Sequence, residues 1–393
     1  MKTVHFKVFS EFLKSESLSG VILLACVILS LAIANSSLSD CFNNFLALEA
    51  GFSSGFLQLK YPLLLWINDG LMAIFFLMVG LEIKRELAEG ELASIKQAAL
   101  PVFAALGGVL VPAFIYLFFN QGTPTADGWG IPMATDIAFA LAIITILGDK
   151  VPLSLKIFLA ALAIVDDLVA ILVIAVFYSS DLHVLYLAYA GGIFLLLLGL
   201  NRLGVKSLLF YLVPGLVMWY FIHHSGIHAT IAGVLTAFTL PTTPDNVESP
   251  LEKLEHLLMK PVNFLIMPVF ALTNTNIRFE SGMLEGIATP LGLGIVFGLV
   301  VGKPLGIFLF CFSSVKAGVC ALPAGAQWSH IFGVGLLGGI GFTMSVFMAN
   351  LSFTAPLILA ESKFAILAGS ILAGLLGYIV LRRISKTDSI EKG

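Results

Sequence analysis

The sequence predicts an all-α integral membrane protein with about 12 transmembrane helices. Of its 393 residues, 59% are hydrophobic and only 11% are charged, whereas roughly a quarter of the residues in soluble proteins carry charge. The apolar stretches recur along almost the whole chain, and most are long enough to cross a hydrocarbon core about 30 Å thick. We therefore expect residues 1–393 to form a single polytopic membrane domain.

The formal net charge of the chain is only −3. A balance this small does not suit the broad basic surface of a nucleic-acid-binding protein, so we expect no nucleic-acid partner. The four cysteines have neither paired spacing nor an accompanying histidine cluster, which argues against a disulfide framework and against a zinc site. We expect no cofactor.

Apolar runs of about 20 residues mark the predicted spans. The second run is long, so its polar end should protrude from the bilayer, and the seventh and eighth are short. The first run ends in Ala32-Ile33-Ala34, which resembles a signal-peptide cleavage site, but the polar stretch before it is long and contains acidic residues. The twelve predicted spans are 16–34, 62–89, 98–119, 124–147, 152–178, 185–203, 208–222, 226–240, 257–274, 290–314, 329–353 and 360–384.

The basic residues orient these spans. One set of connections holds 17 of the 21 lysines and arginines, the opposite set holds only three, and Lys303 falls inside a span. Because loops rich in lysine and arginine stay in the cytoplasm, both termini are predicted to be cytoplasmic. The predicted segments are a cytoplasmic N-terminus at 1–15, an external loop or short β-hairpin within 35–61, and a cytoplasmic tail at 385–393.

Four ionisable side chains remain at membrane depth after the loops are assigned: Asp136, Asp166, Asp167 and Lys303. A fifth, Asp69, lies nearer the external end of its span. One charge at a helix centre costs roughly 2.5–3.5 kcal/mol, so these groups must be paired, hydrated or protonated. A single ion pair can be structural, but three acids against one base leave surplus negative charge. The pattern favours a site for cations and protons.

Two of the spans contain interruptions. In the fourth, Pro132 and Thr135 precede Asp136, and proline removes a helix donor and frees a carbonyl. In the eleventh, three glycines lie within 338–341. Such breaks indicate ion sites in transporters, although either segment alone also suits a close helix crossing. Each of spans 3–5 lies seven spans before its counterpart in spans 10–12. Consecutive spans cross the membrane in opposite directions, so counterparts separated by an odd number also cross in opposite directions. If the two sets are repeats, their topology is therefore inverted.

Six segments together resemble the bacterial NhaA family of Na+/H+ antiporters, and the match covers nearly the whole chain. Inverted repeats and broken helices are a known property of that family, so the repeat argument agrees with the resemblance. The segments are Asn68–Phe76, Gly80–Glu86, Pro132–Phe139, Ala163–Asp167, Ser225–Gly233 and Val301–Gly306.

The resemblance implies a bacterial inner-membrane protein that expels Na+ or Li+ in exchange for protons. It implies that Asp166 and Asp167 bind the cation and carry protons, that Lys303 pairs with Asp166, and that Asp136 and Thr135 lie where the broken helices cross. Family members form homodimers partly through an external hairpin. Here 45–60 has alternating apolar positions compatible with a hairpin, and a plain loop suits the sequence equally well. The resemblance also gives His228, at the external end of the eighth span, a minor packing or gating role.

Exchange follows from competition for the same oxygens. Adjacent carboxylates in a poorly solvated site repel each other, so at least one proton is loosely held near cellular pH. Sodium prefers oxygen ligands and needs them deprotonated. With three acids and Lys303 ionised the site carries a charge of −2, so two protons neutralise it and one Na+ does not. We therefore expect more protons than sodium ions to move in each cycle.

The cytoplasmic ends of the second and ninth spans supply a second cluster. A histidine among acids titrates near neutrality, and the resemblance implies that these regions sense pH; charges that cap solvated helix ends are the alternative. Family members often carry a second histidine just before a proline, where Met259-Lys260-Pro261 stands here, so the pH set point does not follow from the family. The cluster comprises Glu82, Arg85, Glu86, Glu252, Glu255 and His256.

Other functions fit the sequence less well. A transporter that couples cations to an organic solute would need a larger polar cavity, and the spans supply no arginine for an anionic substrate. An intramembrane aspartyl protease takes one acid from each of two helices, whereas Asp166 and Asp167 are adjacent on one helix. A channel is disfavoured because nothing repeats as a filter or a charged ring.

Overall fold

The computed structural model describes residues 2–55, 57–148, 151–179, 182–242, 248–279 and 283–390. Lys150 and Lys392, two of the 17 basic residues that orient the predicted spans, lie outside the described residues. The fold is helical apart from four two-residue strands. Contacts divide the chain into two compact units. The first is Met1–Ala25, Ser94–Ala170 and Ile277–Gly393, and the second is Cys26–Ala93 and Ile171–Asn276.

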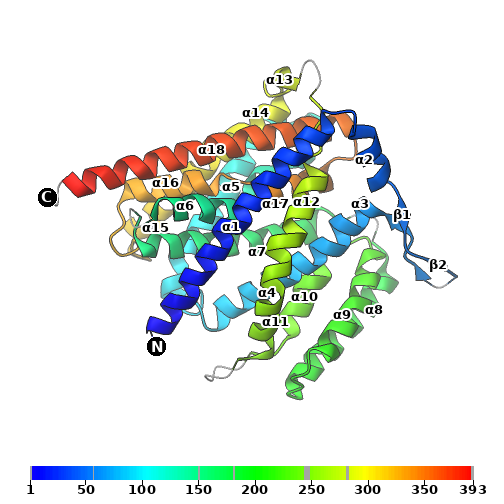
Figure 1. The fold of residues 1–393 in the computed structure, drawn as a ribbon. Coiled ribbons are helices and arrows are strands. Elements are labelled where there is room, and N and C mark those ends of the chain that lie inside the picture. Colours follow the sequence, from blue (N-terminus) through cyan, green and yellow to red (C-terminus); the bar gives the residue numbers. More distant parts are fainter. Residues whose placement is uncertain are drawn as a thin grey trace. The chain divides into compact units, whose positions relative to one another are not determined.

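The first unit is built largely from the middle and the C-terminal third of the chain (Figure 1). Two long helices, α1 (Lys2–Ala34) and α7 (Leu153–Phe177), contribute residues to both units. The other elements of the first unit are α5 (Ile95–Asn120), η2 (Ala126–Met133), α6 (Ile137–Ile146), α13 (Met283–Gly286), α14 (Pro290–Phe297), η5 (Gly298–Gly302), α15 (Lys303–Lys316), α16 (Trp328–Gly338), α17 (Phe342–Ser352) and α18 (Pro356–Ile390).

Small residues allow the helices of the first unit to approach closely. Helices α5 and α15 pack together where Gly107 meets Gly306, and a Cβ at Gly107 would lie 2.1 Å from the carbonyl oxygen of Gly306. In membrane proteins such contacts let backbones pack without a hydrophobic driving force between helices. This close packing on α5 holds α15 in place, and Lys303 is the first residue of α15.

Both spans predicted to be interrupted are broken in the structure. The first break is an extended stretch from Ala134 to Asp136 between the 3₁₀-helix η2 and α6. The second separates α16 from α17, whose axes differ by 47°. The two breaks meet, because the amide of Asp136 donates a hydrogen bond of 2.6 Å to the carbonyl oxygen of Ile340. Backbone groups freed by the breaks are thus partly satisfied by each other, as membrane burial requires.

The second unit contains the remaining helices and the strands. Helix α4 packs on α10 through Gly233, where a Cβ would lie 2.2 Å from the carbonyl oxygen of Ala73. Helices α8 and α9 lie side by side. The elements are α2 (Ser39–Leu46), β1 (Glu49–Ala50), β2 (Ser53–Ser54), β3 (Leu57–Gln58), β4 (Tyr61–Pro62), α3 (Leu63–Leu65), the π-helix η1 (Trp66–Leu71), α4 (Met72–Ala88), α8 (Val184–Arg202), α9 (Leu209–His223), α10 (Ile231–Thr239), α11 (Pro250–Pro261), the π-helix η4 (Val262–Ile266) and α12 (Met267–Asn274).

The four strands lie within the segment predicted as an external loop or hairpin. Strand β1 pairs antiparallel with β4, and β2 pairs antiparallel with β3. An exposed ion pair joins the ends, with 2.7 Å between Lys60 Nζ and Glu49 Oε2. The hydrogen bond and the charge of Glu49 raise the pKa of Lys60. The side of the membrane on which these strands lie stays a prediction.

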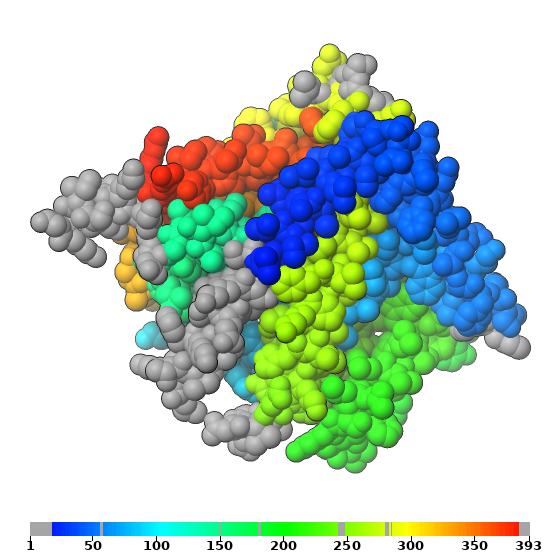
Figure 2. All heavy atoms as spheres, in the orientation of Figure 1, coloured from blue at the N-terminus to red at the C-terminus, as the bar shows by residue number. Residues whose placement is uncertain are grey.

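The helices are numerous and apolar enough for a multi-pass membrane protein. Among the described residues, eight helices are long and apolar enough to cross a membrane, or up to ten if two bent pairs each count as one span. Each of the twelve predicted ranges contains a helix, but α9 and α10, the seventh and eighth, are shorter. Many leucine and valine side chains of α8 and α9, green in Figure 2, point outward, as expected for helices that face lipid. The count of twelve and the inverted repeats stay predictions.

Candidate ion site at the helix breaks

The centre of the first unit holds a buried ion pair. Asp166 comes from the middle of α7, and Lys303 is the first residue of α15, directly after the π-helix η5. Lys303 Nζ lies 2.6 Å from Asp166 Oδ2, and neither side chain is exposed. Lys303 Nζ also donates to the carbonyl oxygen of Met133, at the end of η2. One ammonium thus links α7 to a carbonyl that the helix break has released.

Thr135 brings the same break to the carboxylate. Its hydroxyl oxygen lies 2.6 Å from Asp166 Oδ2 and 2.9 Å from the carbonyl oxygen of Gly338. A hydroxyl has one proton to donate, so it bonds either to the acid of α7 or to the end of α16. This gives the site two alternative arrangements that differ by the rotation of one side chain.

Asp136 caps two helices at once. Its Oδ1 accepts from the amide of Phe139 at 3.2 Å, in the first turn of α6. Its Oδ2 accepts from the amide of Thr343 at 3.0 Å, and also from the hydroxyl of Thr343, in the first turn of α17. A carboxylate suits this place because two helix N-termini direct their amides and partial positive charges at it. Asp136 therefore ties together the two broken spans.

Asp167 differs from its neighbours because no hydrogen bond of its carboxylate to another described residue is found. Its Oδ1 and the Oδ1 of Asp166 are buried without a hydrogen-bonding partner among the described residues. Unpaired buried oxygens are costly, so each is available to a proton or to a cation. Three acids and one lysine are more than nine-tenths buried here: Asp136, Asp166, Asp167 and Lys303.

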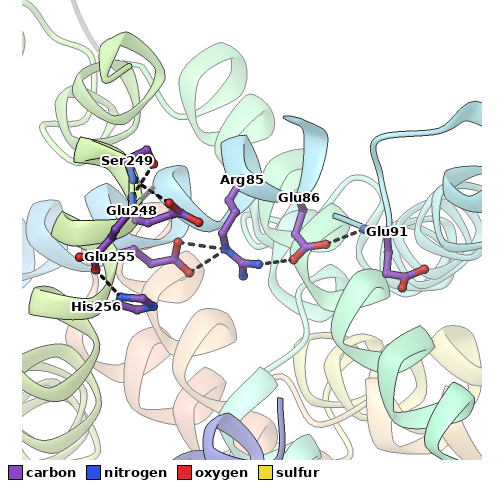
Figure 3. Close-up of polar contacts among 8 residues, drawn as sticks. Arg85, Glu86, Glu91, Glu248, Ser249, Glu255 and His256 are labelled. Atoms are coloured by element: carbon purple, nitrogen blue, oxygen red, sulfur yellow. Dashed lines mark hydrogen bonds and ion pairs between the residues drawn. The ribbon is translucent and has the colours of Figure 1, made fainter. Parts of the chain in front are cut away.

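A second polar cluster lies in the second unit, at the end of α4 and the start of α11. Figure 3 shows Arg85 between two acids. Arg85 Nε lies 3.0 Å from both carboxylate oxygens of Glu255, and Nη1 lies 3.0 Å from Glu86 Oε1. Glu86 Oε2 accepts in turn from the amide of Glu91. Because Glu255 is only 4% exposed, its charge depends on Arg85.

The other predicted members of this cluster have more local roles. Glu252 forms a capping box with Ser249 at the start of α11. His256 pairs with Glu248, with 3.0 Å between His256 Nδ1 and Glu248 Oε1, and both side chains are more than half exposed. Glu82 contributes charge near Arg85. Among the described residues, no hydrogen bond joins His256 to Arg85 or Glu255.

Asp69 and His228, predicted at external helix ends, contact each other in the second unit. His228 Nε2 lies 3.4 Å from Asp69 Oδ1, and His223 Nδ1 lies 3.3 Å from Asp69 Oδ2. His228 also contacts Thr230, with 2.9 Å between Nδ1 and the hydroxyl oxygen. Asp69 therefore links the π-helix η1 to the end of α9 and to the segment before α10.

Sequence reasoning missed three partners: Thr343, His223 and Glu248. Thr343 follows the glycine-rich break, and a hydroxyl residue directly after a helix break is a signal for a capping role. His223 and Glu248 carry no such signal, because their roles arise only when distant segments meet. Isolated polar residues at helix ends are common, so no spacing rule identifies them.

Comparisons with known proteins identify relatives that match almost the whole chain. The family described as Na+/H+ antiporter 1 matches residues 10–381. The chain is 65% identical over 386 residues to "Na(+)/H(+) antiporter NhaA 2" of Flavobacterium johnsoniae, covering 98% of this chain and 95% of the relative. It is 52% identical over 388 residues to the NhaA antiporter of Dechloromonas aromatica, covering 98% and 97%. It is 50% identical over 383 residues to that of Flavobacterium psychrophilum, covering 98% of each.

Proposed function

We propose a mechanism from the premise that this chain belongs to the NhaA family of Na+/H+ antiporters. The family consists of transporters, not catalytic enzymes, and its members exchange sodium for protons across a membrane. The observation that carries the proposal is that Asp166 Oδ1 and Asp167 Oδ1, at the crossing of two broken helices, are buried without a hydrogen-bonding partner among the described residues. The cargo is Na+ or Li+, exchanged for H+, and no cofactor takes part.

The ion site consists of oxygens that a proton or a metal cation can occupy. We assign Asp166 Oδ1 and Asp167 Oδ1 as ligands, because hard cations prefer oxygen. Thr135 is assigned as a neighbouring hydroxyl that steadies Asp166. Carboxylates must lose their protons to bind a cation. Occupation by Na+ and occupation by protons are therefore mutually exclusive.

Exchange then requires only that the loaded site open alternately to each face of the membrane. The broken helices support this step, because Asp136 and Thr135 hold the crossing through hydrogen bonds to separate segments. Rearranging a few such bonds costs far less than unfolding a continuous helix. Changing the load at the site biases the protein between two conformations.

The charge of the site argues for electrogenic exchange. With Asp136, Asp166 and Asp167 ionised and Lys303 protonated, the site carries −2, so one Na+ leaves it at −1 and two protons neutralise it. Asp167 carries one proton, and the candidates for the second are Asp166, Asp136 and Lys303. More protons than sodium ions then move in each cycle, and the membrane potential drives transport together with the pH gradient.

Reconstituted vesicles test both parts of the proposal. Adding Na+ or Li+ to wild-type vesicles should collapse an imposed proton gradient, whereas K+ should not. An imposed potential of the driving sign should accelerate Na+ movement at fixed pH. Rates that ignore the potential would exclude unequal exchange, and an equal response to all three cations would exclude a selective site.

We also propose that the cluster around Arg85 regulates activity in response to cytoplasmic pH. The support is the burial of Glu255 and its dependence on Arg85 for charge compensation, since Arg85 also pairs with Glu86. Protonating Glu255 would release Arg85 and loosen the contact between α4 and α11. Members with local roles, Glu82, Glu252 and His256, adjust the charge around this pair.

The cellular arrangement follows from the charge distribution and the family. We propose a bacterial inner membrane protein with both termini in the cytoplasm, as the 17 basic residues on one side indicate. The paired strands of 49–62 are proposed to lie outside the cell and to join two chains in a homodimer. Small exposed strand edges are suited to such pairing.

A further inference from the structure

A cavity in the second unit is separate from the proposed ion site and from the Arg85 cluster, and it adjoins the segment that carries Asp69. It has a volume of about 610 Å³ and is bounded by the segment from α3 to α4, by α9 and by α10. Pockets that hold ligands commonly measure about 300–1,000 Å³. Among its lining residues are Trp66, Gly70, Ile74, Leu216, Trp219 and Thr236.

The lining is almost entirely apolar, and the side-chain donors in it already have partners. The indole of Trp66 donates to the carbonyl oxygen of Ala50 at 3.0 Å, and that of Trp219 donates to the carbonyl oxygen of Asp69 at 3.3 Å. The hydroxyl of Thr236 donates to its own helix, at 2.8 Å from the carbonyl oxygen of Ala232. An apolar cavity whose polar groups are satisfied does not hold water. Its occupant must itself be apolar.

The opening of the cavity is formed by side chains suited to lipid. Leu216 is 67% exposed and Ile74 is 36% exposed, and both line the cavity. Leu209 and Val213 of α9, the helix that carries Leu216, are exposed as well. A hydrophobic helix surface of this kind in a multi-pass membrane protein faces hydrocarbon, so the molecules that reach the opening are lipid chains.

Aromatic side chains mark the end of the cavity that lies nearest the membrane surface. The rings of Trp66 and Trp219 are stacked with centroids 6.1 Å apart, and Trp219 is stacked on His223. Tyr61 packs edge-on against His223. Tryptophan and tyrosine gather at the level of lipid headgroups. The cavity therefore extends from the headgroup level into the hydrocarbon region.

We propose that this cavity binds one acyl chain of a membrane phospholipid, which enters past Leu216 and Ile74 and packs against the two stacked indoles. The chain fills space between the π-helix η1 and the pair α9 and α10. The bound acyl chain packs as part of the hydrophobic core of the second unit and can dissociate from it. This binding site is independent of the ion site and of the proposed transport mechanism.

Tryptophan fluorescence tests the proposal directly. The chain contains four tryptophans, so replacing Trp129 and Trp328 with phenylalanine leaves only the two that line the cavity. This protein is reconstituted at full length into phosphatidylethanolamine and phosphatidylglycerol vesicles, with plain acyl chains or with chains brominated at mid-length. Bromine quenches an indole only on contact, so brominated lipid should quench the signal strongly.

A substitution at Gly70 separates the cavity from the bulk bilayer. A Cβ at Gly70 would meet only Trp66, at 3.4 Å, so Gly70→Ala is a matched control and Gly70→Leu fills the cavity. The proposal expects Gly70→Ala to retain the quenching and Gly70→Leu to lose most of it. Equal quenching in both variants would overturn it.

One further variant and two further outcomes keep the test decisive. Ala232→Leu fills the cavity from α10 and replaces Gly70→Leu if that variant does not fold. Quenching that is absent at high protein density and appears on dilution would show that a second copy of this chain covers the opening, which contradicts a bound lipid chain. No quenching at any density would show an empty cavity and would also overturn the proposal.

Discussion

The ammonium of Lys303 lies 2.6 Å from a carboxylate oxygen of Asp166, and both side chains are completely buried. Breaking such a pair by removing one charge typically costs about 3–5 kcal/mol, because the other charge is left without compensation. The pair therefore links stability to transport, and a change that removes one charge should affect both.

Replacing Asp166 with asparagine should destabilise the protein by about 3–5 kcal/mol and abolish transport. The physical reason is that Lys303 keeps its contact with the carbonyl oxygen of Met133 but loses the carboxylate that compensates its buried charge. Adding Lys303→Met should recover most of the stability and none of the transport. Thermal unfolding in detergent and proton-gradient collapse measure the two effects. A double variant no more stable than the single one would contradict the role assigned to the pair.

Thr343 should prove to be a positioning residue for Asp136. Thr343→Val removes the hydroxyl bond and keeps the amide bond, so stability should fall by about 1.5–3 kcal/mol, the value for a hydrogen bond to a charged group. The apparent affinity for Na+ should weaken, since the crossing is held less firmly. Thr343→Ser is the matched control and should behave as wild type in both assays. Equal losses in the serine variant would indicate a packing role for the methyl group instead.

The pH dependence of transport should respond more to Glu255 than to His256. Glu255→Gln keeps this position uncharged at every pH, as protonation does at low pH. Transport activity should therefore fall, and the increase of activity with pH should become flatter. His256→Ala should leave the profile close to that of wild type, because its partner Glu248 is exposed. Initial rates across a range of cytoplasmic pH measure this. The reverse order of effects would move the sensor to the histidine.

The strands near Glu49 and Lys60 should keep their ion pair at neutral and moderately alkaline pH. A raised lysine pKa means that the pair is complete below the ordinary value of about 10.4 and is lost as pH rises through the raised value. If the strands join two chains, the dimer fraction in detergent should be constant up to about pH 10 and fall above it. Lys60→Gln should remove that fall, and a dimer unaffected by deleting 51–59 would refute the interface.

Much of the ion site could be predicted because membrane burial makes charges expensive. Asp136, Asp166, Asp167 and Lys303 were identified by their depth in apolar runs, and Pro132 indicated the break beside them. The sequence did not reveal that Asp136 caps both broken spans, because that requires knowing which segments cross. Thr343 was missed for the same reason.

Other features could not be predicted because hydropathy reports only how apolar a segment is. Helices α9 and α10 are short, so length alone is a poor guide to the number of spans. The partner of His256 is Glu248 and not a buried acid, because the direction of a side chain on a helix end depends on how the preceding loop enters. Apolar residues around the cavity look like ordinary core in the sequence, since a void leaves no pattern.

The central claim is that Na+ and protons compete for the oxygens of Asp166 and Asp167. Adding Na+ to the purified antiporter in weak buffer should release protons, and the release should saturate with Na+ concentration. Asp167→Asn should remove this release while the protein remains folded, because no hydrogen bond from Asp167 to another described residue is lost. Proton release that is unchanged in Asp167→Asn, or Na+ binding without any release, would contradict the claim.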